Sequence, residues 1–322
     1  MNRASESLEL FAELQRAPES SSPARQPRGR VSKISAAALT TTPPHGINAN
    51  NKPKSVSIGE LETQRIYHGN FLELAKKLPD QSVDLIIADP PYNASKGNAL
   101  SLESGKLSGT GGNWKKIDQV WDDMSLEEYL NFTMNWLTEA RRVLKQTGSM
   151  WVHGTYHSAG ITNVAMQILG IEIINEIVWY KRNSFPNLAG RRLTASHETI
   201  LWAHRGGKRA YRFNYKHSKT GDFSDDQLKS AGKQMRTVWD LPNNKPRHEQ
   251  AFGKHPAQKP VRLARRIIQL SAQPGDLCVV PFAGSGTECV AALEEGLHFI
   301  GFDTDLDYVN VARARLNAGQ DQ

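Results

Sequence analysis

The sequence predicts an α/β protein with a mostly parallel, doubly wound sheet. Short apolar runs such as Val83–Ala88 and Leu277–Val280 are typical of strands that a parallel sheet buries on both faces. Amphipathic helical patterns alternate with these runs. Residues 277–303 also form a complete strand–helix–strand unit, which is the connection that parallel strands require.

The chain divides into four predicted regions. Residues 1–58 are rich in Ser, Pro, Thr and Asn, and we expect a flexible tail. Residues 59–204 form the first half of the sheet domain, residues 205–254 lack the α/β rhythm, and residues 255–322 form the second half of the domain. Within the first half, the Gly-, Ser- and Lys-rich stretch 93–120 is long enough to be a functional loop, and we expect it to be a mobile lid.

The elements of the first half follow from local patterns. Ser125 and Glu128 fit a capping box, which predicts a helix from there to about Lys145. The remaining apolar patterns predict strands at 83–88, 149–153, 172–179 and 198–203, and a helix at 158–169. In the second half, Pro260 is placed to begin an amphipathic helix over 261–270, and Gly296 to end a helix over 288–295.

Asp89-Pro90-Pro91-Tyr92 follows the strand 83–88 directly. The two prolines must end the strand, because they cannot continue its hydrogen bonding. The motif therefore lies at the carboxyl edge of the sheet, where open α/β sheets bind ligands. The Asp89 carboxylate and the Pro90 carbonyl could accept the N–H groups of an exocyclic amine, while the Tyr92 ring stacks on its heterocycle. The alternative is a rigid surface turn.

A glycine-rich turn follows the strand 277–280. Gly284 and Gly286 would let the backbone approach a ligand, and the start of the next helix favours an anionic group. Asp303 ends the following strand, where an acid suits ribose hydroxyls. A dinucleotide site is the alternative, but Cys289 stands in the position of the third glycine of that motif.

The motif at 89–92 resembles the catalytic motif of the DNA amino-methyltransferases, which methylate N6 of adenine or N4 of cytosine. The string 281–287 resembles their cofactor motif, and the string 255–260 resembles the segment that abuts the cofactor. The catalytic motif precedes the cofactor motif, as in the beta class of this family. The resemblance spans roughly residues 64–317 and implies a circularly permuted methyltransferase fold with a small inserted DNA-recognition lobe.

The resemblance implies a site-specific adenine-N6 methyltransferase of a type II restriction–modification system. It implies a catalytic role for Asp89, Pro90, Pro91 and Tyr92. It gives cofactor binding to Asn70, Asp89, His255, Lys259, Pro281, Phe282, Ala283, Gly284, Ser285, Gly286, Thr287 and Asp303, with Lys259 facing the methionine carboxylate. The expected cofactor is S-adenosylmethionine and the expected substrate is duplex DNA. A restriction endonuclease would be a functional partner without direct binding, and a weak homodimer stays open.

Two other functions remain open. Ser is commoner than Asp at the first position of the motif in N4-cytosine enzymes, so cytosine is the second choice of base. The family usually has Asp at the positions of Asn70 and Val280, and often Thr at that of Ala257. These departures leave open a catalytically weak DNA-binding subunit of the same fold. Methylation of RNA or protein is a further alternative.

The distribution of charge points to nucleic acid. Residues 181–262 carry 18 Lys and Arg against 6 Asp and Glu, although the whole chain has a net charge of only +7. A basic middle on an otherwise acidic chain is typical of a DNA-binding face. The predicted DNA contacts are Arg191, Arg192, Arg205, Lys208, Arg209, Arg212 and Lys216. The last five lie in residues 205–254, which we predict to be the target-recognition segment.

The remaining features of the sequence bear on the cellular location of the protein and on metal binding. The sequence has no apolar run of the length that a membrane span needs, and no signal-peptide core near its start. Cys278 and Cys289 are its two cysteines and lack the spacing of a metal site, so we expect neither a metal nor a disulfide framework. We therefore expect a cytoplasmic bacterial protein that is associated with the nucleoid through DNA.

Overall fold

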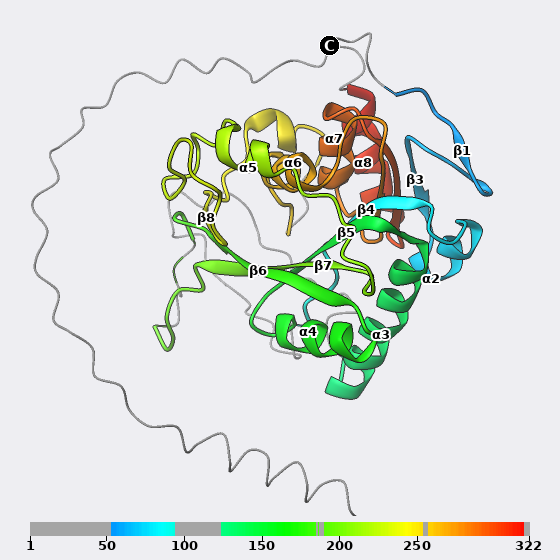
Figure 1. The fold of residues 1–322 in the computed structure, drawn as a ribbon, viewed down its shortest axis with the longest axis horizontal. Helices are drawn as coiled ribbons and strands as arrows, with labels where there is room; N and C mark the ends of the chain where they lie inside the picture. The colour runs from blue at the N-terminus through cyan, green and yellow to red at the C-terminus, as the bar shows by residue number, and fades with distance from the viewer. Residues whose placement is uncertain (1–52, 94–123, 185, 187–189, 254–256, 319–322) are drawn as a thin grey trace, which may run out of the picture. The chain divides into compact units, whose positions relative to one another are not determined.

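The structure, a computed structural model, describes residues 53–93, 124–184, 186, 190–253 and 257–318. Its core is an eight-stranded sheet with the order β3-β10-β9-β4-β5-β7-β6-β8 (Figure 1). The strands of this sheet are β3 (Arg65–His68), β4 (Val83–Ala88), β5 (Leu144–Gly154), β6 (Glu172–Tyr180), β7 (His197–His204), β8 (Val238–Asp240), β9 (Leu277–Val280) and β10 (His298–Asp303). A separate hairpin joins β1 (Ser57–Ile58) to β2 (Leu61–Glu62).

The direction of the strands defines two edges of the sheet. The neighbours β3, β10, β9, β4 and β5 are all parallel, and β7 runs antiparallel to both β5 and β6. We call the edge where β4 and its parallel neighbours end the carboxyl edge, and the other one the amino edge. Because β7 is reversed, it begins at the carboxyl edge and ends at the amino edge.

Helices cover both faces of the sheet. In Figure 1, α5, α6, α7 and α8 lie on one face, and α3 and α4 lie on the other. The helices are α2 (Phe71–Leu74), α3 (Leu126–Val143), α4 (Ala159–Ile168), α5 (Tyr215–Thr220), α6 (Val261–Ser271), α7 (Thr287–Glu294) and α8 (Leu306–Ala318). The buried apolar residues accordingly form two clusters, one on each face. Among the described residues, no helix is both long and apolar enough to cross a membrane.

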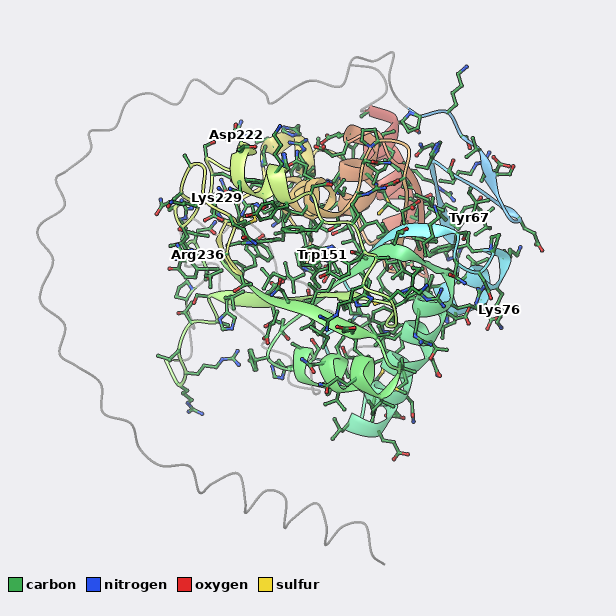
Figure 2. All side chains as sticks on the ribbon, in the orientation of Figure 1. Tyr67, Lys76, Trp151, Asp222, Lys229 and Arg236 are labelled. Carbon is green, nitrogen blue, oxygen red and sulfur yellow. The ribbon has the colours of Figure 1, made fainter. Side chains whose placement is uncertain are left out.

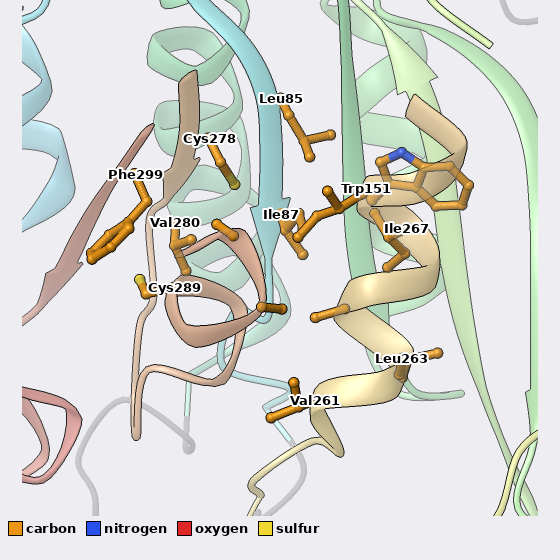
Figure 3. Packing of buried hydrophobic residues seen from close by; sticks show 14 of the residues in the cluster. Leu85, Ile87, Trp151, Val261, Leu263, Ile267, Cys278, Val280, Cys289 and Phe299 are labelled. Atoms are coloured by element: carbon orange, nitrogen blue, oxygen red, sulfur yellow. The ribbon is translucent and has the colours of Figure 1, made fainter. Parts of the chain in front are cut away.

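Packing of α6 against β4 fixes the centre of the molecule. Figure 3 shows Ile267 of α6 beside Trp151 of β5, with Leu85 and Ile87 on the neighbouring β4 and Leu263 one turn earlier on α6. All five side chains belong to one buried apolar cluster. These five side chains are at most 1% exposed. Burying a side chain of this size is worth roughly 1.5–3 kcal/mol. The contact therefore holds α6, and the segment just before it, firmly over the strand that precedes the catalytic motif.

Most elements that the sequence predicts are confirmed. The capping box is complete, since the Ser125 hydroxyl and the Glu128 carboxylate each accept a hydrogen bond from the other residue's backbone N–H. Pro260 is the N-cap of α6, as predicted. The strand at 149–153 is longer than expected, because the chain passes from α3 directly into β5 and a register shift lets Leu144 pair with Val83.

The segment 205–254 is more closely joined to the sheet than its sequence suggests. It contains α5 and β8, and β8 extends the main sheet beside β6. Gly46–Gln322 form one compact unit, and Trp239 of β8 is buried near Trp151. Figure 2 shows Asp222, Lys229 and Arg236 gathered at the β8 end of the sheet, whereas Tyr67 and Lys76 lie at the β3 end. Residues 205–254 thus pack on the rest of the sheet domain.

Two predicted regions fall mainly outside the described residues. Residues 1–52 of the predicted tail are not described, and its last two residues form β1. The predicted lid 93–120 is described only at Asn93. Both the flexible tail and the mobile lid stay predictions.

A buried arginine attaches the recognition segment to α6. The Arg266 guanidinium is 3% exposed and donates to the Asp226 carboxylate at 2.6 Å and to Asp225 at 3.0 Å. Its central carbon lies 5.0 Å from the centre of the Phe223 ring and 5.3 Å from that of Trp239. Arg266 therefore joins a cation–π contact to a buried ion pair.

We predict that Arg266→Met lowers the free energy of unfolding by about 3–5 kcal/mol, because it leaves the buried Asp226 charge without its cation. The neighbouring substitution Arg265→Met removes a half-exposed pair with Glu294 and Glu295 and should cost less than about 1 kcal/mol. Urea denaturation followed by circular dichroism compares the two. Equal losses of unfolding free energy would show that the buried ion pair contributes no more to stability than the exposed one.

Candidate active site

The turn after β4 carries Asp89 to the middle of the carboxyl edge. Its neighbours there are the ends of β9 and β5, because β4 pairs with both strands. Pro90 is buried, and the Pro91 carbonyl accepts a hydrogen bond of 2.8 Å from the Tyr129 hydroxyl of α3. Asn93 then takes a left-handed conformation, with φ of 53°. The turn is stiff because two prolines restrict it and α3 holds it from one side.

Asn93 also pairs with Met124, the first described residue after 94–123. Its side-chain amide donates to the Met124 carbonyl at 2.8 Å and accepts from the Met124 N–H at 2.8 Å. Asn tolerates a positive φ better than most residues, and its short amide can mimic a backbone partner. These paired bonds hold the two ends of residues 94–123 together beside the catalytic turn.

Asp89 lies at the centre of a buried network of charges. Lys259 donates to its Oδ2 at 2.7 Å, and the Tyr92 hydroxyl donates to its Oδ1. Lys259 also lies 2.9 Å from the Tyr92 hydroxyl and 3.5 Å from Oε2 of Glu198. Glu198 is in turn held by Lys181, whose Nζ lies 2.8 Å from Oε1. Two carboxylates and two ammonium groups thus balance one another at the carboxyl edge.

The network sets the protonation of its members. Burial acts to raise the pKa of Asp89, but the charge of Lys259 and the hydrogen bonds from Lys259 and Tyr92 together hold that pKa below its ordinary value. Burial acts to lower the pKa of Lys259, but Asp89 and Glu198 raise it. The pKa of Tyr92 is raised well above its ordinary value by burial and by the charge of Asp89. At neutral pH, Asp89 is therefore an anion, Lys259 a cation and Tyr92 a neutral phenol.

His153 of β5 lies next to this network. It is 1% exposed, and its Nδ1 has no hydrogen-bond partner among the described residues. Burial lowers its pKa to about 4, with Asp89 and Glu198 opposing and Lys259 contributing to that shift. The ring is neutral at physiological pH, so it adds a polar edge to the site without adding a charge.

The glycine turn after β9 lies beside the catalytic turn and is braced from α8. Gly286 has φ of 76°, and a side chain there would approach the Ala312 Cβ to 2.8 Å. The Arg315 guanidinium donates to the Ser285 carbonyl at 2.6 Å and to the Thr287 hydroxyl at 3.2 Å. This position requires glycine for its conformation and for its close contact with α8.

Asp303 and Lys259 tie the turn to its neighbours. The Gly284 N–H donates to Oδ2 of Asp303 at 2.7 Å, across the ends of β9 and β10. The Thr287 hydroxyl donates to the Lys259 carbonyl at 3.3 Å, and the side chain of Lys259 reaches Asp89. Lys259 therefore connects the glycine turn to the Asp89 carboxylate. The predicted contact of Lys259 with a methionine carboxylate stays a prediction.

The other predicted cofactor residues are placed as follows. The Pro281–Thr287 string forms the turn between β9 and α7, and the Phe282 ring packs edge-on against Trp136 of α3 with centroids 5.5 Å apart. Asn70 follows β3 at the same edge and caps α2 by accepting from the Leu72 N–H at 2.9 Å. His255 lies outside the described residues. Their contacts with a cofactor stay predictions.

The donor set fits a nucleoside cofactor that carries an amino acid. The Asp303 carboxylate at the tip of β10 suits ribose hydroxyls, and the glycine turn with the start of α7 suits a carboxylate. No group of three or more His, Cys, Asp or Glu side chains that could hold a metal occurs within the described ranges. Cys278 and Cys289 are free, buried thiols that pack in the core.

The predicted DNA-binding residues fall into two separate groups. Arg191 and Arg192 are exposed in the segment between β6 and β7, at the carboxyl edge, where Arg192 donates to the Tyr156 hydroxyl at 2.8 Å. Arg205, Lys208 and Arg209 follow the end of β7, at the amino edge. The length of β7, about 3.3 Å per residue, separates the two groups by roughly 25 Å.

Two of the predicted DNA-binding residues in this part of the chain form ion pairs within the protein. Arg209 forms an ion pair with Glu172, at the start of β6, and Arg212 forms one with Asp276, just before β9. Lys216 is exposed on α5. This group lies away from Asp89, so its position does not support the DNA contacts that the sequence predicts for it.

Three residues of the site were not found from the sequence: Lys181, Glu198 and His153. Glu198 precedes an apolar strand and so looked like a strand boundary, and His153 lies inside an apolar strand. A buried polar residue is informative only when its burial is known. The sequence does hold one signal, since Lys181 and Glu198 flank two adjacent predicted strands and would meet if these formed a hairpin.

Comparison with known proteins agrees with this geometry. The family model for the N6/N4 DNA methylases matches residues 83–314. The type II methyltransferase M2.LlaDCHI of Lactococcus lactis subsp. cremoris is 38% identical over 262 residues, which cover 81% of this chain and 91% of the relative. M2.DpnII of Streptococcus pneumoniae is 38% identical over 253 residues, which cover 79% and 89%.

Solved structures share the fold. The cytosine-N4-specific PvuII DNA methyltransferase has a TM-score of 0.58 at 19% identity and covers 78% of this chain and 85% of its own. The complex of M1.HpyAVI with SAM has a TM-score of 0.55 at 24% identity and covers 79% and 98%. At these identities the likeness concerns the fold alone.

The chain therefore belongs to the N6/N4 DNA methylase family. It is a DNA methyltransferase with the α/β methyltransferase fold, and S-adenosylmethionine is its cofactor, as the sequence predicts. The motif pattern also predicts a particular similarity to the modification methyltransferase of the RsrI restriction system. The relatives named above do not show this similarity.

We predict that Glu288→Gln stabilises the protein increasingly as the pH rises. Burial and the charge of Asp89 raise the pKa of Glu288 from its ordinary 4.5 to about 7. Between these values the unfolded chain loses a proton that the folded protein retains, so folding stability falls by about 1.4 kcal/mol per pH unit. Below this window both states are protonated, and above it both are ionised.

Urea denaturation at pH 5 and pH 8 measures this effect. The advantage of the Gln variant over the wild type should grow by roughly 2–3 kcal/mol between the two pH values. Glu73→Gln, at an exposed ion pair on α2, is the control and should show a difference that does not depend on pH. A pH-independent difference for Glu288→Gln would contradict the raised pKa.

Proposed function

We propose that the protein transfers the methyl group of S-adenosylmethionine to N6 of an adenine that is flipped out of duplex DNA. One observation carries this proposal: the Asp89 carboxylate, which is 17% exposed, is paired with Lys259 at the end of β4, and β4 is adjacent to β9, which leads into the glycine turn of the cofactor half. Asp at the first position of the motif favours adenine in this family. Like the type II methyltransferases that it resembles, the protein would protect DNA from a cognate restriction endonuclease without binding it.

The chemistry requires an acceptor rather than a strong base. The amino nitrogen of adenine is a weak nucleophile, because its lone pair is delocalised into the ring. It is also far too weak an acid for a carboxylate with a lowered pKa to deprotonate before the transfer. Asp89 and the Pro90 carbonyl instead accept N–H bonds that strengthen as the nitrogen gains positive charge. Holding the amine in line with the methyl donor supplies the remaining rate enhancement.

The target base must leave the helix to reach this site. Extrusion of a base costs a few kcal/mol, and enzymes offset this by stacking the base on an aromatic ring and binding its polar edge. Tyr92 supplies the ring, and Asp89, Pro90 and the neutral His153 line the polar side. A cytosine presents a similar amino group, so N4-cytosine methylation is the second candidate.

The catalytically weak DNA-binding subunit is the remaining alternative. The two departures that motivate it lie outside the charge network: Val280 is completely buried in the apolar cluster under α6 and α7, and Asn70 caps α2. The acid, the aromatic ring and the glycine turn are all present. We therefore propose an active enzyme.

Product analysis tests the function. Plasmid DNA from a host without DNA methylation is incubated with the full chain and tritiated S-adenosylmethionine, then digested to nucleosides. We expect the label in N6-methyl-2′-deoxyadenosine. Label in N4-methyl-2′-deoxycytidine would show that the target base is cytosine. No label in DNA would refute the proposed activity.

In the same assay, Asp89→Ala should lower incorporation by at least about a thousandfold, since it removes both the amine acceptor and the partner of Lys259. Binding of S-adenosylmethionine, measured by calorimetry, should change by less than about threefold. Asp84→Asn is the matched control. Asp84 lies on the same strand near the amino edge, where it pairs with Lys145 at 2.8 Å, and its loss should leave the rate unchanged. Substantial turnover by the Ala variant would remove Asp89 from the mechanism.

We also propose that the DNA lies along the carboxyl edge. Arg191 and Arg192 are exposed there, and Arg247 is exposed in the short 3-10 helix Arg247–Gln250 that follows β8. Their position beside Asp89 lets them contact phosphates flanking a flipped base. Association with the nucleoid in the cytoplasm would follow from this contact, while a weak homodimer stays a prediction.

Salt dependence separates the two groups of basic residues. Each phosphate contact contributes about 0.9 to the slope of log K against log salt. Replacing Arg191 and Arg192 by Ala should therefore reduce this slope by about 2 in fluorescence-anisotropy titrations with duplex DNA. Replacing Lys208 and Arg209, at the amino edge, should leave it unchanged. The opposite result would place the DNA at the amino edge.

A further inference from the structure

Both carboxylate oxygens of the catalytic acid are engaged within the protein. The Tyr92 hydroxyl donates to Oδ1 of Asp89, and the Lys259 ammonium donates to Oδ2 at 2.7 Å. Each oxygen of a carboxylate can accept a second hydrogen bond, but an amino group that takes the position of the Tyr92 hydroxyl or of the Lys259 ammonium on Asp89 displaces that donor. The displaced donor is buried, since Lys259 is 4% exposed, so it needs another acceptor inside the site.

Glu198 is the acceptor within reach. Its Oε2 lies 3.5 Å from the Lys259 ammonium and 3.4 Å from the Tyr92 hydroxyl, a little beyond a good hydrogen bond in both cases. A shift of less than about 1 Å by either donor would close the distance. The two donors of Asp89 thus already lie between two carboxylates.

The β6–β7 hairpin holds Glu198 in this position. Glu198 is opposite Trp179 in the antiparallel register, and it is 9% exposed. The Lys181 ammonium lies 2.8 Å from Oε1 and leaves Oε2 directed toward Lys259 and Tyr92. A group on a strand, fixed by a second charge, can receive a donor without reorganising.

We propose that Glu198 is a positioning residue that receives Lys259 and the Tyr92 hydroxyl from Asp89 as the amino group of the target base binds. The exchange gives the buried Lys259 ammonium a second carboxylate as its partner, while Asp89 accepts hydrogen bonds from the amino group in place of those it loses. It also frees Asp89 to accept from the base and frees the Tyr92 ring to stack on it. Lys181 keeps Glu198 ionised for this exchange, because burial alone would raise the pKa of Glu198 and the two lysines lower it.

This inference rests on the proposed methyl transfer, and a kinetic comparison tests it separately. Glu198→Gln retains the shape of the side chain but cannot neutralise an ammonium, and Glu198→Asp retains the charge but is one methylene too short to reach Lys259. We expect both variants to lower the single-turnover rate of methyl transfer by at least about tenfold. The KM values for DNA and for S-adenosylmethionine should stay within about threefold of the wild type.

Three controls isolate the role. Glu172→Gln makes the same change on the same hairpin at the amino edge, where Glu172 pairs with His204 and Arg209, and should leave the rate unchanged. Lys181→Arg should retain most of the rate, whereas Lys181→Met should lower it. Thermal unfolding of each variant measures any loss of stability. A purely structural role for Glu198 would lower the unfolding temperature and raise the KM values together.

The outcomes are distinguishable. A wild type that does not methylate DNA refutes the proposed function. An active wild type with a Glu198→Gln rate within threefold of it overturns the role of Glu198 and leaves the function intact. An effect confined to KM, or an equal loss in Glu172→Gln, overturns the role as well.

Discussion

The ion pair between Lys259 and Asp89 is the interaction on which the site depends. It joins residues 170 positions apart in the chain and lies between the two halves of the methyltransferase domain. Asp89 ends β4, and Lys259 stands just before α6, which packs on β4 through Leu263 and Ile267 (Figure 3). Because both groups are buried, each keeps the other ionised. The ion pair therefore forms only when the two halves of the domain are together.

The direction of β7 decides which charged residues serve the site. A reversed strand brings its first residues to the carboxyl edge, so Glu198 meets Asp89 and Lys259 there. The same reversal carries the chain after β7 to the amino edge. Arg205 and its basic neighbours therefore lie far from the catalytic turn, although they are only a few residues from Glu198 in sequence. Net charge along a segment is evidence for nucleic-acid binding, but strand direction determines where that charge is presented.

Two of the departures from the family pattern, at Val280 and Asn70, have structural explanations. Val280 ends a short strand that is buried on both faces, and its side chain contributes to the apolar cluster beneath α6 and α7. An acid there would need a partner inside the core. Asn70 retains an oxygen that caps α2. Neither position belongs to the network around Asp89, which is complete in the structure.

The sequence by itself determined the fold class, the catalytic tetrad and the glycine turn. Proline and glycine act on their own backbone, a capping box needs only one turn of helix, and apolar periodicity reports burial directly. Only the tertiary structure decided that β8 joins the sheet and that Lys181, Glu198 and His153 complete the site. It also separated Arg191 and Arg192 from the amino-edge cations. These contacts depend on strand order and direction, which arise from packing between segments far apart in the chain and leave no local pattern in the residues themselves.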